Sequence, residues 1–170
     1  LLRHIIETAG EIGALLLESR LIKTDNPLFN QRLRRIRSLC SLQLQETPQG
    51  QVPRVVDGTT VHLGATPGLY GLFSSRHAAT GKLKELAQQH RLCLATLGLE
   101  KTSARGCFGL QIKTCLGACV GLEDRRAHDQ RLLTALQDSQ VEVWPFSGPV
   151  DLIEEAHGWV QKHRVHNWCY

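Results

Sequence analysis

The sequence predicts an α+β protein, because segments with helical and with strand-like patterns both occur along its 170 residues. Two segments, 9–24 and 76–91, repeat apolar residues at helical spacing, and a third, 123–138, is expected to form a charged helix. Several shorter apolar runs are bounded by glycine and proline, which is typical of strands. A stretch rich in proline and glycine at 46–68 is the best candidate for a domain boundary. A chain of this length can bury one good core or two small ones.

The chain begins with a predicted strand and a predicted helix. Residues 1–7 have the pattern of a strand, and Thr8 to Glu11 forms a capping-box motif. The helix is expected to run from Ala9 to about Thr24, and Pro27 closes the segment. Its broad apolar face contains Ile12, Leu15, Leu16, Leu17, Leu21 and Ile22.

Glu18 lies in the middle of this apolar face. A carboxylate there is costly unless it is paired or bound to a cation. The periodicity alone favours the ordinary explanation, in which the side chain reaches solvent or pairs with Arg20 or Lys23.

An arginine-rich segment follows the first helix. It contains Arg32, Arg34, Arg35 and Arg37, interleaved with two apolar residues. Guanidinium groups suit phosphate oxygens, and such a stripe gives salt-sensitive affinity for a nucleic-acid backbone. A solvated basic face is the alternative. Because residues 26–45 contain no Asp or Glu, we favour phosphate binding.

The middle and the end of the chain alternate between short strands and helices. Strands are expected at 38–45, 52–57 and 59–63, the last two weak. Helices are expected at 76–91 and 123–138. A final hairpin is predicted from strands at 141–144 and 150–153, joined by a turn at 145–149. The eight histidines show no metal-ligand spacing and are expected to be surface or ordinary core residues.

Four of the six cysteines occur between residues 93 and 119, in the order Cys93-x13-Cys107-x7-Cys115-x3-Cys119. If the last pair is helical, both of its thiolates leave the same face. Zinc usually takes tight Cys-x2-4-Cys pairs, whereas iron–sulfur clusters accept wider gaps, so the spacing favours [4Fe–4S] over zinc. Buried cysteines that only fill a core, or two disulfides in a secreted chain, are the alternatives.

The composition of the chain favours a globular protein over a disordered or membrane-spanning one. With 21% charged and 42% hydrophobic residues the chain is globular rather than disordered, and its net charge of +4 permits a nucleic-acid partner. No signal peptide and no membrane-length apolar run is present, so we expect a reducing, cytoplasmic location without a membrane.

Two stretches carry a family resemblance. Residues 11–23, followed by Pro27–Leu28–Phe29–Asn30, resemble the second half of the nuclease domain in UvrC-type GIY-YIG excinucleases, where an EALLLE-x-x-LIK-x-x-x-P-x-[YF]-N motif occurs. Gly71–Leu72–Phe73, the four cysteines, Gln111–Ile112–Lys113 and Val120–Gly121 resemble the cysteine-rich region that follows. Both motifs stand in the family's order over residues 8–122, and the pattern is most similar to the shorter homologues of the Cho type.

The resemblance implies specific residue roles. Glu18 would be the catalytic carboxylate that binds Mg²⁺ or Mn²⁺, and Asn30 a supporting catalytic residue. Lys23 and the four arginines would contact DNA. The ligands of a [4Fe–4S] cluster, or of zinc as the alternative, would be Cys93, Cys107, Cys115 and Cys119. The implied partners are damaged double-stranded DNA and the UvrB–DNA pre-incision complex.

The resemblance also implies a function and a domain plan. The function is metal-dependent incision of damaged DNA on the 3′ side of a lesion in nucleotide excision repair, within the SOS response. The plan places the C-terminal part of a GIY-YIG domain at 1–46 and a linker at 47–68. A cysteine-rich region at 69–122 and a helix with a β-hairpin at 123–170 follow.

This sequence departs from the family pattern in two places. The GIY and YIG strands, with their catalytic tyrosines, are expected upstream of Leu1, and neither Tyr70 nor Tyr170 can replace them. The predicted hairpin at 141–153 stands where a full UvrC would carry a UvrB-binding helical hairpin. We therefore expect a chain that lacks the first catalytic half and is inactive alone. The alternative function is a non-catalytic DNA- or partner-binding fragment with a structural four-cysteine site.

Overall fold

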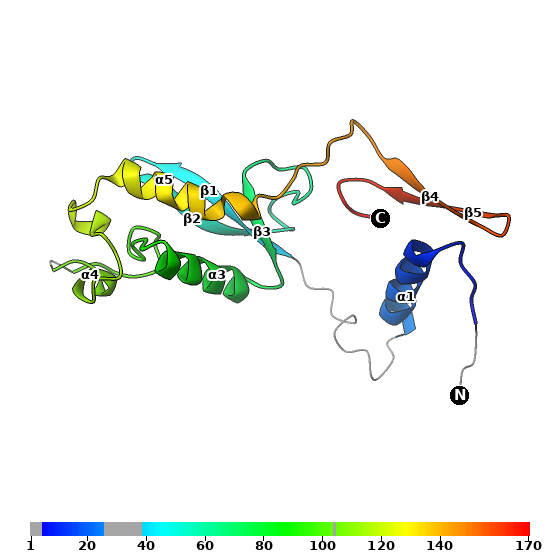
Figure 1. The fold of residues 1–170 in the computed structure, drawn as a ribbon, viewed down its shortest axis with the longest axis horizontal. Helices are drawn as coiled ribbons and strands as arrows, with labels where there is room; N and C mark the ends of the chain where they lie inside the picture. The colour runs from blue at the N-terminus through cyan, green and yellow to red at the C-terminus, as the bar shows by residue number, and fades with distance from the viewer. Residues whose placement is uncertain (1–4, 26–38, 104) are drawn as a thin grey trace. The chain divides into compact units, whose positions relative to one another are not determined.

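The computed structural model describes residues 5–25, 39–103 and 105–170 (Figure 1). The chain forms two compact units. The larger unit comprises Ser38–Val143, and the smaller one comprises Leu1–Arg37 together with Trp144–Tyr170.

The larger unit is built on a three-stranded antiparallel sheet in the order β2-β1-β3. Its strands are β1 (Cys40–Thr47), β2 (Gly50–Asp57) and β3 (Leu69–Phe73). A tight turn joins β1 to β2, and Gly50 adopts a φ of 111° there. A side chain at Gly50 would also collide with the carboxylate of Asp129, so only glycine allows the turn and this helix residue to approach each other.

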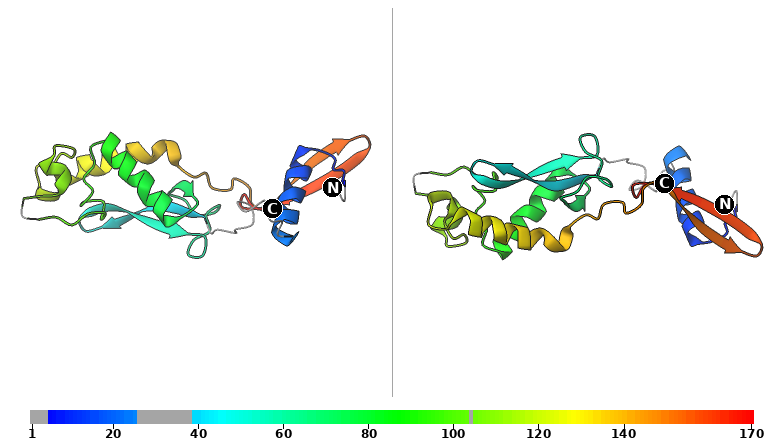
Figure 2. Two further views of the ribbon diagram at one scale, coloured as in Figure 1. Left: turned by 90° about the horizontal axis from the view of Figure 1, so that it is seen from below. Right: turned by 90° about the horizontal axis from the view of Figure 1, so that it is seen from above.

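Two helices, α3 (Arg76–Gln89) and α5 (Arg125–Leu136), cover one face of this sheet (Figure 2). Each helix starts at a capping side chain: Ser75 accepts from the N–H of Ala78, and Asp124 accepts from the N–H of Ala127. The buried core between helices and sheet consists of Leu42, Ala79, Leu83, Leu86, Ala87, Leu92, Leu97, Leu132 and Leu136.

The segment between α3 and α5 is mostly irregular and holds the clustered cysteines. It contains one turn of helix, α4 (Phe108–Gln111), and the 3₁₀ turn η1 (Ala118–Val120). A second 3₁₀ turn, η2 (Gln137–Ser139), follows α5. Because so little of this segment is regular, its conformation depends on side-chain contacts more than on helix or sheet hydrogen bonds.

The smaller unit combines helix α1 (Glu11–Asp25) with a hairpin of β4 (Val150–Ala156) and β5 (Trp159–Val165). The carboxylate of Glu154 on β4 accepts the N–H groups of Ile12 and Gly13 at 2.8 and 2.7 Å. These are among the N–H groups that a helix leaves unpaired at its start, so a residue far along the chain caps α1.

The α+β class is confirmed, and the three predicted helices correspond to α1, α3 and α5. The predicted strand at 38–45 corresponds to β1, and the one at 52–57 lies within β2. The predicted domain limit between residues 46 and 47 falls inside β1.

Several sequence predictions were wrong. Residues 59–63 form turns instead of a strand, because the side chain and carbonyl of Asp57 bind Thr59, Thr60 and Val61 locally. Strand β3 was missed. Residues 5–8 form no strand, and the Thr8 hydroxyl donates to the carbonyl of Gly10 rather than completing a capping box.

The predicted C-terminal hairpin was placed too early in the chain. Residues 141–144 form no strand, although Val141 donates its N–H to the carbonyl of Leu69 in β3. The real hairpin pairs β4 with β5 through a two-residue turn at His157 and Gly158, both with positive φ. Such a turn matches the twist of antiparallel strands, and this stabilises the later pairing.

Across the described residues, no helix is both long and apolar enough to cross a bilayer.

Candidate metal centre

The cysteines converge because three separate backbone turns bring them together. Cys93 follows α3 after Arg91, which takes a positive φ of 52° and reverses the chain. Cys107 caps α4, and its sulfur accepts from the N–H of Leu110 at 3.3 Å. Cys115 comes after α4, beyond another positive-φ residue, Lys113. No α-helix runs from Cys115 to Cys119: residues 115–117 are irregular, and Cys119 lies in η1.

Three of the four predicted ligands lie within one buried cluster. The sulfur of Cys107 is 3.6 Å from that of Cys93 and 3.3 Å from that of Cys115. All three side chains are almost fully buried, and their sulfurs lie within 4.8 Å of one another. Cys119 is half-buried and packs at the edge of the same cluster. The structure therefore brings Cys93, Cys107 and Cys115 into one group and places Cys119 against it.

No disulfide joins any of the six cysteines, all of which belong to the described residues. The sulfur separations of 3.3 and 3.6 Å far exceed the roughly 2.0 Å of a disulfide bond. Cys40 lies in β1, and Cys169 is exposed near the C-terminus. The two cysteines that the spacing excluded are therefore not part of the cluster.

Burial and hydrogen bonds shift the pKa values of three of the thiols in the cluster. It raises the pKa of Cys115 to about 12 and that of Cys119 to about 11. At Cys93 burial also acts to raise the pKa, but hydrogen bonds from Thr96 and from the neighbouring thiols lower it to about 7. Thiols that hold their protons this tightly must lose them when a cation binds, so metal uptake at this cluster releases protons.

The residues fit a thiolate-bound metal. Thiolates are the preferred ligands of zinc and of iron–sulfur clusters. The two short sulfur separations approach the ~3.8 Å that follows for two thiolates on one tetrahedral zinc with Zn–S bonds of about 2.3 Å. Cys119 packs against the same three cysteines, so four thiolates are at hand for either zinc or an iron–sulfur cluster. In the described part of the chain no other group of three or more His, Cys, Asp or Glu side chains converges.

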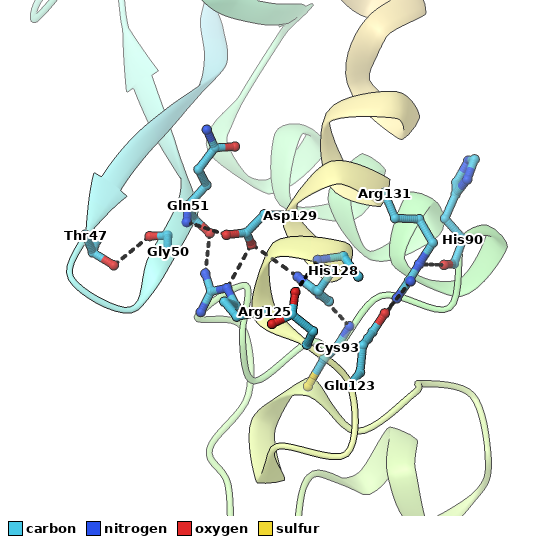
Figure 3. Close-up of polar contacts among 12 residues, drawn as sticks. Thr47, Gly50, Gln51, His90, Cys93, Glu123, Arg125, His128, Asp129 and Arg131 are labelled. Carbon is cyan, nitrogen blue, oxygen red and sulfur yellow. Dashed lines mark hydrogen bonds and ion pairs between the residues drawn. The ribbon is translucent and has the colours of Figure 1, made fainter.

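A buried histidine supports the cluster from α5 (Figure 3). The backbone N–H of Cys93 donates to Nε2 of His128 at 3.1 Å, so this nitrogen carries no proton. The proton then sits on Nδ1, which faces the carboxylate of Asp129 at 3.4 Å. Burial lowers the pKa of His128, although the nearby carboxylates oppose this. The neutral ring therefore fixes the backbone that carries the first cysteine.

The same contacts connect the cluster to the sheet. Asp129 accepts from Nε of Arg125 at 2.8 Å and from the backbone N–H of Gln51 in β2 at 2.9 Å (Figure 3). Arg125 also donates to the carbonyl of Gln51. The Asp129 carboxylate thus binds the N–H of Gln51, and the Arg125 guanidinium binds its carbonyl oxygen. These two hydrogen bonds join α5 to the start of β2, next to the β1–β2 turn.

Arg131 holds the two ends of the cysteine segment together. Its guanidinium pairs with Glu123, just before α5, and donates to the carbonyl of His90 at the end of α3 (Figure 3). Both partners flank the cysteine segment. Arg131 therefore holds the two ends of the cysteine segment close to each other.

Residues 39–138 match the sequence profile of the family described as "UvrC/Cho excinuclease, middle domain". The chain belongs to the UvrC/Cho excinuclease family. The matched range nearly coincides with the larger unit, Ser38–Val143, and it includes all four clustered cysteines and His128.

Curated relatives extend the likeness beyond this range. The chain is 47% identical to excinuclease cho of Salmonella typhi over 164 residues, which is 96% of the chain and 55% of the relative. It is 46% identical to excinuclease cho of Escherichia coli strain K12, over 96% of the chain and 54% of the relative. UvrABC system protein C of Maricaulis maris is 32% identical over 75% of the chain and 20% of its own length. The chain spans about half the length of the excinuclease cho relatives it matches. No solved structure matches it.

The other site residues that the UvrC/Cho resemblance implied lie away from the cysteines in sequence. Glu18 is an exposed residue of α1, so its carboxylate does not carry the desolvation cost expected for the middle of a buried face. It lines a hollow of about 270 Å³ together with Thr8, Leu17 and Leu21. Lys23 is exposed on the same helix. The remaining residues, Asn30, Arg32, Arg34, Arg35 and Arg37, lie outside the described residues.

Sequence reasoning missed His128. It was grouped with scattered histidines, yet it is fully buried beside the cluster. A signal was present: His128, Leu132 and Leu136 follow one another at intervals of four, and the two leucines belong to the buried face of α5. A histidine in register with core leucines requires a buried hydrogen-bond partner, and here that partner is the backbone of Cys93.

Proposed function

We propose that this chain forms part of a DNA endonuclease of nucleotide excision repair, which incises damaged DNA on the 3′ side of a lesion. One observation carries the proposal. The excinuclease family match coincides with the unit that holds the buried cysteine cluster, and likeness to excinuclease cho continues through the helix that bears Glu18.

Glu18 is the proposed catalytic carboxylate. Its exposure on α1 suits a role in which one protein carboxylate, substrate phosphate and water share a Mg²⁺ or Mn²⁺ ion. Such an ion supplies stabilisation of the charge that develops on the phosphate and on the leaving 3′ oxygen. Asn30 would support this site. The substrate backbone would be held by Lys23, Arg32, Arg34, Arg35 and Arg37 through contacts independent of base sequence.

The cysteine centre has a structural role in this proposal. Cys93, Cys107, Cys115 and Cys119 would hold a [4Fe–4S] cluster, with zinc as the alternative, and fix an otherwise irregular segment. We propose that the protein acts on the UvrB–DNA pre-incision complex at a damaged duplex.

A second candidate function is a DNA- or partner-binding module without catalysis. It is favoured by one observation on the described residues: Cys93, Cys107 and Cys115 form the one group of three or more converging ligand side chains, and Glu18 belongs to no such group.

The deciding experiment compares incision by Glu18→Ala and Glu11→Ala in a chain extended before Leu1 by the GIY and YIG strands that the resemblance expects. The substrate is a duplex with one bulky lesion, loaded with UvrB, and the cut is mapped on a sequencing gel. Glu18→Ala should abolish the 3′ cut and leave DNA binding nearly unchanged. Glu11→Ala, which removes another exposed carboxylate of α1, should cut normally. Normal incision by Glu18→Ala would reject Glu18, and absent incision by the extended wild type would favour the binding module.

A further inference from the structure

A hollow of about 300 Å³ lies between α3 and the cysteine segment of the larger unit. Its walls are apolar: Leu92 is buried, whereas Phe108 and Ile112 of the α4 region are 62% and 51% exposed. Lys84 and Gln88, both from α3, stand at its rim. We propose that this hollow receives an unpaired base of a DNA strand. The proposal rests on the proposed function, because it specifies which part of the DNA the larger unit contacts.

The shape and chemistry of the hollow suit a nucleobase. A volume of about 300 Å³ is at the small end of ligand sites, which favours one planar ring over a whole helix as the occupant. A base has two apolar faces for stacking on Phe108 and a polar edge for hydrogen bonds. The Gln88 amide can donate and accept at that edge, and within the described residues this side chain makes no hydrogen bond.

Lys84 is the charged residue that lines the hollow, and the segment that follows α3 is basic in sequence, which suits the phosphates that flank a base. Between residues 91 and 122 the basic residues are Arg91, Lys101, Arg105 and Lys113, and the acidic residue is Glu100. The carboxylate of Glu100 accepts the N–H of Phe108 at 2.6 Å and caps the turn that carries this ring. Lys84 forms no ion pair among the described residues, so its ammonium group remains available for a phosphate.

The wall of the hollow depends on the cysteine cluster. Phe108 directly follows Cys107, and the N–H of Leu110 donates to the sulfur of Cys107. Loss of the metal should therefore disorder the wall and weaken base binding. Loss of the Phe108 ring should weaken base binding and leave the metal in place, because this side chain is mostly exposed.

Because loss of the Phe108 ring should leave the metal in place, the proposal can be tested in the 170-residue chain with its metal bound. Three DNA probes of one sequence are compared: a paired duplex, a duplex with a short unpaired bubble, and a single strand. Phe108→Ala should weaken binding to the bubble and the single strand by about tenfold, since base–aromatic stacking is worth about 1–3 kcal/mol. Binding to the paired duplex should not change. Phe108→Tyr should bind like the wild type.

Two further variants complete the test. Leu122→Ala removes another exposed apolar side chain of the cysteine segment, 74% exposed and outside the hollow, and should change no affinity. Lys84→Gln should lower the salt slope for the single strand by about 0.7. Metal content and thermal melting of each variant show that it remains folded. In the wild type, 5-iodouracil placed in the bubble should crosslink on irradiation to Phe108 or its neighbours in α4.

Defined outcomes overturn the proposal. Equal bubble affinity of Phe108→Ala and wild type, an equal loss of affinity on all three probes, or a crosslink elsewhere in the chain would each reject the base site. A wild type that binds the paired duplex and the bubble equally rejects the base site and leaves the proposed function intact. A wild type that binds none of the probes also rejects the base site, and the incision experiment with UvrB-loaded DNA then decides the proposed function.

Discussion

The backbone N–H of Cys93 donates to Nε2 of the buried His128, which places a helix residue of α5 directly behind the first cysteine of the cluster. This bond fixes the ring tautomer, and Asp129 on the other side of the ring continues the contact to the β1–β2 turn. The cysteine cluster is thus fixed to the folded sheet through one histidine. Residues that hydrogen-bond to metal-ligand residues orient those ligands, and replacing such residues commonly lowers metal affinity.

Replacing His128 should therefore weaken the metal site. His128→Phe fills the space but leaves the Cys93 N–H without an acceptor in a buried position, which costs about 1–3 kcal/mol. We expect the metal to be lost to a chelator about 10–100 times faster or at correspondingly lower chelator concentration. His77→Phe, at an exposed position of α3, is the control and should retain the metal like the wild type. Equal retention by both variants would contradict the supporting role.

The cysteines should differ in their effect on metal and on local order. Cys115→Ser should lose the metal and increase amide hydrogen exchange across residues 93–122, because this segment has little regular structure of its own. The sheet with α3 and α5 should keep its protection, since its leucine-rich core does not include the cysteines. Cys169→Ser, at the exposed C-terminal cysteine, should do neither. Unchanged exchange in Cys115→Ser would mean that the cysteines only fill a core.

The Glu154 cap should make the start of α1 sensitive to acid. Partial burial acts to raise the pKa of Glu154, but the N–H groups of Gly13 and Ile12 and the His163 ring lower it below its ordinary value of 4.5. The ionised cap therefore stabilises the folded state above about pH 4.5, and this contribution disappears as the pH falls through the lowered pKa.

Amide exchange measures this effect directly. The protection of Ile12 and Gly13, corrected for intrinsic rates, should fall as the pH is lowered below about 4.5. Glu154→Gln should remove most of the pH dependence and leave lower protection throughout. Glu155→Gln, the neighbouring carboxylate on β4, should behave like the wild type. Identical profiles for the Glu154 and Glu155 variants would rule out the cap.

The arginine-rich segment should set the salt dependence of DNA binding. Reversing Arg34 and Arg35 to Glu should lower the slope of log affinity against log salt by about 2–4, at ~0.9 for each phosphate that the variant no longer neutralises or now repels. The control reverses Arg54 and Arg126, both exposed in the larger unit, and carries the same change in net charge. A slope that changes equally in both double variants would assign the effect to net charge rather than to phosphate binding by the segment.

The elements that the sequence predicted best were those whose signal is local. Helix α3 was found because the helical spacing of Ala79, Leu83, Leu86 and Ala87 is readable in one segment, and α5 was found as a charged helical segment. Strand β3 was missed because Gly71 takes a positive φ of 68° within it and the following serines resemble a loop. Its strand character depends on pairing with β1, which no local pattern reports.

The same distinction separates what was predicted of the metal centre from what was missed. Thiols are few and their spacing can be counted, so the convergence of Cys93, Cys107 and Cys115 was predicted. The cap of α1 by Glu154 joins residues from opposite ends of the chain, and no sequence pattern reports such a contact. Neither does any pattern report the partner of His128, although its spacing with core leucines marks it as buried.

The most direct test of this account is the metal and sulfide content of protein purified without oxygen. We expect a brown protein with iron and acid-labile sulfide in about a 1:1 ratio, as a cubane requires, and loss of both in Cys115→Ser and Cys119→Ser. One equivalent of zinc in colourless protein would keep the four-thiolate site and reject the cluster. Protein that carries no metal, with unchanged stability in Cys115→Ser, would contradict the metal centre itself.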